Sequence, residues 1–160
     1  MSSPASIKKH PLHPMLVALP LGLWVFAFVC DLIHVSSGNT VWATVALYAV
    51  GGGIAGALIA ALPGLIDYLS IDEAEMKRIA TWHLFLNVGA MLIFAVDLWL
   101  RFHLAAESKL PMLISLCGVA LVGFGGWLGG EMVYVRGMAV EPVEKLSGRK
   151  SQRPQLRRTG

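Results

Sequence analysis

The chain has 160 residues, of which 56% are hydrophobic and only 14% are charged. About a quarter of the residues in a soluble domain are charged, so this composition excludes an ordinary soluble protein and indicates a membrane protein. The net charge of +3 comes from the C-terminal tail and from loops on one side of the apolar runs. It therefore bears on membrane orientation, and we do not expect nucleic-acid binding.

Four long apolar runs predict the fold, because each reaches the ~20 residues that a helix needs to cross the hydrocarbon core. They cover approximately residues 14–34, 41–66, 79–102 and 110–132. The sequence therefore predicts an all-α protein, a bundle of four transmembrane helices within residues 10–140. A polar segment, 1–9, precedes the bundle, and a basic tail, 141–160, follows it and is expected to be disordered.

The 13 Lys and Arg residues predict the orientation of the bundle. If the N-terminus is cytoplasmic, only Arg101 and Lys109 lie on the outer side, and the other basic residues lie on the inner side. This distribution follows the positive-inside rule, so we expect both termini in the cytoplasm. The basic tail would then lie near the anionic lipids of the inner leaflet.

The segment His-Pro-Leu-His-Pro, residues 10–14, precedes the first apolar run. A residue before proline is disfavoured in a helix, and Pro14 suits a first helical position, so we expect His13 to be the N-cap. Pro11 allows two paths. A β-turn would bring His10 and His13 close enough to share a ligand, whereas an extended path would keep them apart.

The third apolar run carries several polar residues on one face. Counted from His83 at about 100° per residue, Asp97 and Arg101 lie within about 40° of it. Charged residues in a transmembrane helix normally face protein, so this face and Asp31 of the first run should point into the bundle. We predict that Asp31, Asp97 and Arg101 form a structural polar clamp at the outer end.

At the cytoplasmic end, the helices bring histidines and carboxylates together. The residues concerned are His10, His13, Asp67, His83 and Glu131. They allow a hydrogen-bonded plug without a ligand, a b-type haem with His13 and His83 as axial ligands, or a transition metal ion held by the three histidines with Asp67 or Glu131. The haem hypothesis rests on two neutral imidazoles placed at similar depth on parallel helices.

Two further histidines, His34 and His103, lie near the outer end. A second haem between them is not expected, because His103 points away from the face that carries His83. The sequence contains no nucleophile motif, no Gly-rich phosphate loop and no acid–base pair of the kind enzymes use, so we do not predict an enzyme.

Five motifs in chain order carry a resemblance to a known family. They are HPLHPMLV at 10–17, PLGLW at 20–24, LPGLIDY at 62–68, WHLFLN at 82–87 and GWLGGEMVY at 126–134. Over residues 10–140 the chain resembles the bacterial membrane family filed as domain of unknown function (DUF) 2231. The resemblance implies a four-helix protein of the bacterial inner (plasma) membrane, in a family without a settled activity.

Similar chains are sometimes grouped with haem-binding four-helix cytochromes or joined to Rieske-type domains, so the resemblance implies a redox role. Two departures argue the other way: Ala18 and Arg136 stand where family members often have a further histidine, which disfavours any site that needs those extra ligands. We still predict an electron-transfer component with haem b or a transition metal ion, working with a respiratory partner. The alternative is a non-catalytic accessory subunit of a larger membrane complex with no bound cofactor.

Overall fold

The computed structural model describes residues 3–139, so the tail expected at 141–160 lies outside the described residues. Four helices within this part are long and apolar enough to cross a membrane, namely Leu12–Ser37, Thr40–Leu69, Ala74–His103 and Leu110–Val135. The prediction of an all-α bundle of four transmembrane helices is confirmed. Each helix extends beyond its apolar run at one or both ends, because polar residues continue the helical turn outside the hydrocarbon region.

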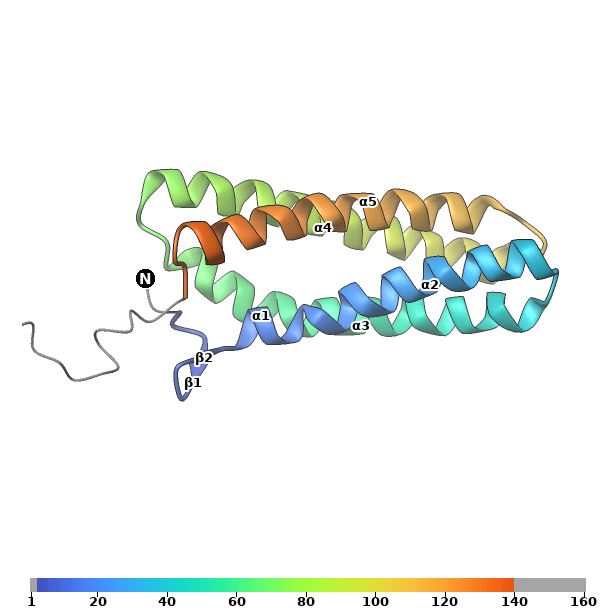
Figure 1. Cartoon of the computed structure of the whole chain (residues 1–160), viewed down its shortest axis with the longest axis horizontal. Helices are drawn as coiled ribbons and strands as arrows, with labels where there is room; N and C mark the ends of the chain where they lie inside the picture. Colours follow the sequence, from blue (N-terminus) through green and yellow to red (C-terminus); the bar gives the residue numbers. More distant parts are fainter. Residues whose placement is uncertain (1–2, 140–160) are drawn as a thin grey trace, which may run out of the picture.

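The helices form two antiparallel hairpins that pack side by side (Figure 1). The elements are β1 (Ser6–Ile7), β2 (His10–Pro11), α1 (Leu12–Leu16), α2 (Ala18–Ser37), α3 (Thr40–Leu69), α4 (Ala74–His103), α5 (Leu110–Gly130) and the π-helical turn η1 (Glu131–Val135). The first hairpin is α1 and α2 with α3, and the second is α4 with α5. Between the hairpins, α2 packs on α5 and α3 on α4.

Both ends of the described chain lie at the same end of the bundle, here called the terminus end (Figure 1). The opposite end, here called the far end, carries the connections 38–39 and 104–109. These names do not depend on which side of the membrane either end occupies.

The first transmembrane helix begins at Leu12 with Pro11 as its N-cap, so His13 lies inside the helix. The prediction of His13 as the N-cap is therefore wrong. The helix is interrupted after Leu16. Pro20 explains the interruption, because proline has no N–H for the carbonyl four residues earlier and its ring collides with that carbonyl.

The interior of the bundle is narrow and depends on close backbone approach. Trp24 of α2 stacks on Phe94 of α4, with ring centres 4.3 Å apart and planes inclined by 10°. Each ring lies against a glycine of its own hairpin: a Cβ on Gly53 would collide with the indole, and a Cβ on Gly118 would lie 2.7 Å from the phenyl ring. Small residues at these two positions let the helices approach closely.

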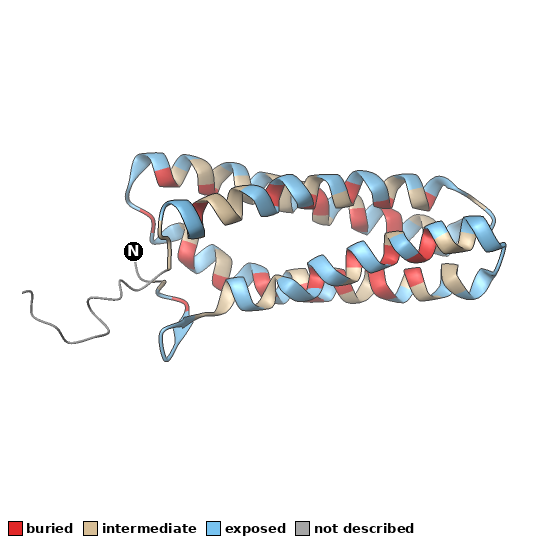
Figure 2. Ribbon diagram, in the orientation of Figure 1, coloured by how far each residue is buried: buried red, intermediate tan, exposed pale blue. Residues whose placement is uncertain are grey.

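Buried residues line the inner faces of the helices, and the outer faces are exposed (Figure 2). Many of the exposed side chains are large and apolar, including Leu62, Trp82 and Trp127, the last 78% exposed. A surface of this kind would be insoluble in water but matches the hydrocarbon of a bilayer. The outer faces are therefore lipid-facing.

Candidate functional site

His13 of α1 and His83 of α4 face each other at the terminus end. Their ring centres are 6.2 Å apart, and the two ring planes are inclined by 89°. One histidine comes from each hairpin, because α1 and α4 run in parallel and begin at the same end of the bundle (Figure 1). The structure thus brings together the two residues that the sequence suggested as axial haem ligands.

Both rings are held through Nδ1. His13 Nδ1 lies 2.8 Å from the carbonyl oxygen of Ala60, and His83 Nδ1 lies 2.8 Å from that of Gly125. A carbonyl oxygen can only accept, so each Nδ1 carries the hydrogen and donates it. In a neutral imidazole the other nitrogen, Nε2, then has an open lone pair. Within the described residues, neither Nε2 takes part in a hydrogen bond.

Glycines next to these carbonyls make room for the rings. A Cβ on Gly64 would lie 2.6 Å from His13 Nδ1, and a Cβ on Gly129 would lie 3.2 Å from His83 Cε1. Each glycine follows, by one helical turn, the residue whose carbonyl accepts the Nδ1 hydrogen. The same local arrangement therefore holds each histidine in its own hairpin.

The two hairpins correspond at several positions. Asp31 and Arg101 are 70 positions apart in the sequence, and so are His13 and His83, and likewise Trp24 and Phe94. In each case the two residues meet in the structure. The bundle therefore behaves as two similar halves whose matching residues meet between the hairpins.

The other three residues predicted at this end take different partners. His10 is exposed in β2, with Nδ1 3.0 Å from the carbonyl of Lys8. Asp67 accepts hydrogen bonds from Ser3 Oγ (2.7 Å) and from the backbone N–H of Ala5. Of the two paths considered for Pro11, the extended one is found, so His10 does not turn back toward the bundle.

Glu131, at the end of α5, pairs with Arg136 at 3.3 Å, and Arg136 also pairs with Glu75 at 3.0 Å. Hydrogen bonding to Glu75 raises the pKa of Arg136 above its ordinary value. Among residues 3–139, no group of three or more His, Cys, Asp or Glu side chains is arranged to hold a metal ion. The five residues proposed for such an ion are thus not gathered in one place.

At the far end, the three residues predicted as a polar clamp are in contact. Arg101 donates from Nη1 and Nη2 to the two carboxylate oxygens of Asp31, at 2.8 and 2.7 Å, and from Nε to Asp97 Oδ2 at 3.1 Å. All three side chains are almost completely buried. The guanidinium thus joins α2 to α4 through a two-pronged contact.

A fourth member of this cluster, Ser115 of α5, was not predicted. Its hydroxyl accepts from Arg101 Nη2 at 2.9 Å and donates to Asp97 Oδ2, also at 2.9 Å. The signal in the sequence was a lone hydroxyl in an apolar run, which favours an interior position. Asp97 Oδ1, by contrast, is buried and has no hydrogen-bond partner within the described residues.

The two outer histidines do not face each other. His103 is exposed and stacks on Trp99 of its own helix. His34 lies near the end of α2 with Nδ1 3.0 Å from the carbonyl of Asn39 and Nε2 2.9 Å from that of Ala106. A second haem between them was not expected, and this arrangement gives it no pair of facing ligands.

A family model described as "Predicted membrane protein (DUF2231)" matches residues 9–142. No curated protein and no solved structure matches the chain.

Proposed function

The chain belongs to the DUF2231 family of membrane proteins, and from the geometry of its histidine pair we propose that it is an electron-transfer protein holding one b-type haem between His13 and His83. Bound haem b would supply one-electron chemistry at its iron. The protein's part is to present the two imidazoles at a fixed separation.

The spacing of the two rings carries this proposal. With metal–nitrogen bonds of about 2.0 Å and ring centres about 1.1 Å from their nitrogens, two imidazoles on opposite sides of one metal have centres about 6 Å apart. The observed separation is 6.2 Å. Both Nδ1 atoms are already used, so Nε2 is the atom left for ligation on each ring.

The number of donors favours haem over a bare metal ion. A structural zinc ion takes four ligands in a tetrahedron, and most transition metals need at least as many. The two imidazoles supply only two, whereas a porphyrin brings four nitrogens of its own and needs only the two axial positions. A transition metal ion held by His10, Asp67 or Glu131 would require these residues to leave their present partners.

The carbonyls of Ala60 and Gly125 support the two histidines by accepting their Nδ1 hydrogens. A backbone carbonyl that accepts the Nδ1 hydrogen fixes the tautomer and the ring orientation and makes Nε2 a stronger donor. The two carbonyls belong to transmembrane helices, so they are rigid supports. These contacts support the proposal, because they would hold both rings in place before a ligand binds.

We further propose a bacterial inner membrane location, with the terminus end in the cytoplasm and a respiratory partner for the electron. The distribution of basic side chains supports this orientation: Lys8 and Lys9 form the exposed tip between β1 and β2, while Arg101 is occupied in the buried clamp. A C-terminal fusion to alkaline phosphatase should be inactive and one to green fluorescent protein fluorescent. The reverse result would overturn the orientation.

The haem proposal is tested by the visible spectrum of purified protein expressed with added haem precursor. We expect Soret and α bands that sharpen on dithionite reduction, with one haem per chain. His13→Ala and His83→Ala should each lose most of the haem, while His103→Ala, the matched control at an exposed histidine, should keep it. An absence of haem bands in the wild type, or full haem content in His83→Ala, would refute the proposal.

A second candidate is a non-catalytic accessory subunit without a cofactor. The observation favouring it is that a separation of 6.2 Å between perpendicular rings is also a normal edge-to-face packing distance. In that case the two histidines only join the hairpins. His83→Phe would then preserve the stability of the bundle, and no cofactor would copurify with the wild type.

A further inference from the structure

The polar cluster at the far end contains more acids than bases. Arg101 is its one cation, and Asp31 and Asp97 are its two carboxyl groups. Both oxygens of Asp31 accept a guanidinium hydrogen, at 2.8 and 2.7 Å, so Asp31 has the contacts of an ionised carboxylate. One positive charge thus balances one negative charge, and the charge of the second carboxyl group is in excess.

Asp97 is the residue left over. Its side chain is 0% exposed, and its Oδ2 accepts from both Arg101 Nε and Ser115 Oγ. Its other oxygen, Oδ1, has no donor among the described residues. A carboxylate with one bare oxygen at this depth is much less favourable than a neutral acid with one unsatisfied hydroxyl. A proton on Oδ1 removes the excess charge without disturbing any of the observed contacts.

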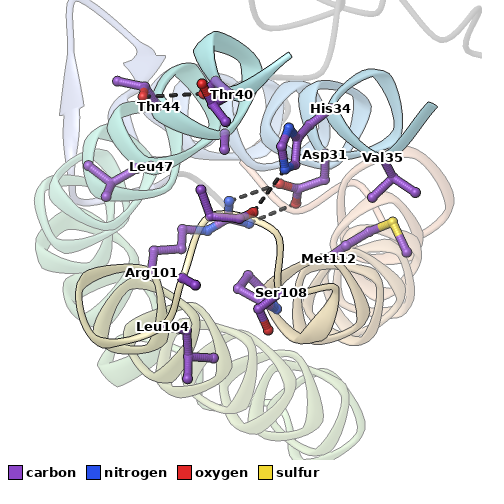
Figure 3. Close-up of a pocket in the computed structure, with 14 residues that line it drawn as sticks. Asp31, His34, Val35, Thr40, Thr44, Leu47, Arg101, Leu104, Ser108 and Met112 are labelled. Carbon is purple, nitrogen blue, oxygen red and sulfur yellow. Dashed lines mark hydrogen bonds and ion pairs between the residues drawn. The ribbon is translucent and has the colours of Figure 1, made fainter. Parts of the chain in front are cut away.

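A cavity at the far end lies next to the two partners of this group, although Asp97 itself is not part of its wall. A cavity of ≈160 Å³ lies between the ends of α2, α3, α4 and α5, and Asp31 and Arg101 form part of its wall (Figure 3). At about 30 Å³ per molecule it has room for several waters. Toward the terminus end, the stacked rings of Trp24 and Phe94 fill the interior less than one helical turn from Asp97.

From this charge balance and from the cavity beside Asp31 and Arg101, we propose that Asp97 is a proton-binding site, which holds a proton on Oδ1 at neutral pH and exchanges it with water that enters from the far-end cavity. The proton comes from hydronium in the cavity and returns to a water molecule there, so the exchange needs no other reactant. The site goes beyond the proposed electron transfer and does not depend on haem being bound.

The other titratable groups near Asp97 do not supply the missing charge. Cys30, buried beside Asp31, is neutral as a thiol. His34 lies at the exposed rim of the cavity, where its two ring nitrogens face the carbonyl oxygens of Asn39 and Ala106. It makes no contact with Asp97 Oδ1. Besides Asp31, His34 and Arg101, the cavity wall contains only uncharged residues.

The proposal is tested by infrared spectroscopy of the full chain in lipid nanodiscs. A protonated carboxyl group gives a C=O stretching band above the amide bands, which moves to lower frequency in heavy water. At pH 7 we expect one such band per chain, shifted by ¹³C-aspartate labelling. It should disappear in Asp97→Asn and move in Asp97→Glu, which keeps the acid but lengthens the side chain.

Two further variants distinguish charge balance from simple burial. In Asp31→Asn, Arg101 has only Asp97 to neutralise, so the band should also disappear although Asp97 is intact. In Asp67→Asn, the matched control, the band should persist, because Asp67 lies at the terminus end with Ser3 and Ala5 as its partners and Asp97 is unchanged.

The proposal is overturned if the wild type has no acid band at pH 7, or if the band survives Asp97→Asn. It is also overturned if Asp31→Asn leaves the band unchanged. A band that is absent in sodium buffer and appears only after sodium is replaced by choline would show that a metal cation, and not a proton, occupies the site. If Asp97→Asn fails to fold, the labelled wild type and Asp97→Glu decide the matter.

Discussion

Replacing Arg101 with methionine removes the one cation of the far-end cluster. Methionine keeps most of the apolar volume of the side chain, so the change isolates the charge and its hydrogen bonds. Asp31, which is 4% exposed, then loses both of its close donors. Removing one partner of a buried ion pair typically costs about 3–5 kcal/mol, because the other charge is left unpaired.

The same cost can be calculated in a second way, if Asp31 takes up a proton in the Arg101→Met variant. An ordinary aspartate ionises near pH 4, so holding one neutral at pH 7 costs about 4 kcal/mol, at about 1.4 kcal/mol per pH unit. The native variant then binds a proton that the unfolded chain has released. The loss should therefore be greatest at high pH and shrink as the pH falls toward about 4.

The measurement is reversible unfolding in mixed micelles of dodecylmaltoside and dodecyl sulfate at pH 5 and pH 8, followed by the fluorescence of the five tryptophans. The double variant Asp31→Asn with Arg101→Met removes both charges of this ion pair, so it should recover most of the stability and should lose the additional pH dependence that Arg101→Met shows relative to the wild type. A loss below about 1 kcal/mol in Arg101→Met would refute this reasoning. So would a double variant no more stable than the single one.

Three smaller changes test the packing around both ends. Gly64→Ala places a Cβ against the His13 ring and should lower the haem content of purified protein, while Gly126→Ala, which meets nothing within 4 Å, should not. Gly118→Ala crowds the stacked aromatic ring and should cost about 1–3 kcal/mol of unfolding free energy, against no loss for Gly123→Ala, where the space is open. Ser115→Ala removes a hydroxyl with two buried partners and should cost about 1–3 kcal/mol in the same unfolding measurement.

The fold and the meeting of His13 with His83 could be predicted from the sequence. Apolar length fixes the number of helices, short connections make neighbouring helices antiparallel, and the first and third helices are then parallel. The polar face of the third helix also predicted that Arg101 would meet both acids. These inferences need only the helical repeat and the cost of exposing charge to lipid.

The hydrogen-bond partners of the two imidazoles could not be predicted from the sequence. They are backbone carbonyls, which every residue type carries. The terminus-end carboxylates show a second limit. Asp67 and Glu131 lie near the ends of their helices, at the terminus end where the sequence predicted them. The direction in which they point depends on the rotation of each helix about its axis, and close packing at glycines sets that rotation, not the polar residues. The residues before the bundle are also fixed locally, since Lys8 and Lys9 both have positive φ and make the turn that pairs Ile7 with His10.

The correspondence between the two hairpins gives the two ends of the bundle different chemistry. At the far end the matching positions hold Asp31 and Arg101, which are opposite in charge and neutralise each other directly. At the terminus end they hold two histidines with the same tautomer, whose Nε2 atoms are both acceptors. Two acceptors cannot hydrogen-bond to each other, so each Nε2 is open to a donor such as water or to a metal ion. Under the proposed function, a metal ion with two open positions would take these two lone pairs, so the same repeated fold would support a clamp of protein side chains at one end and a ligand site at the other.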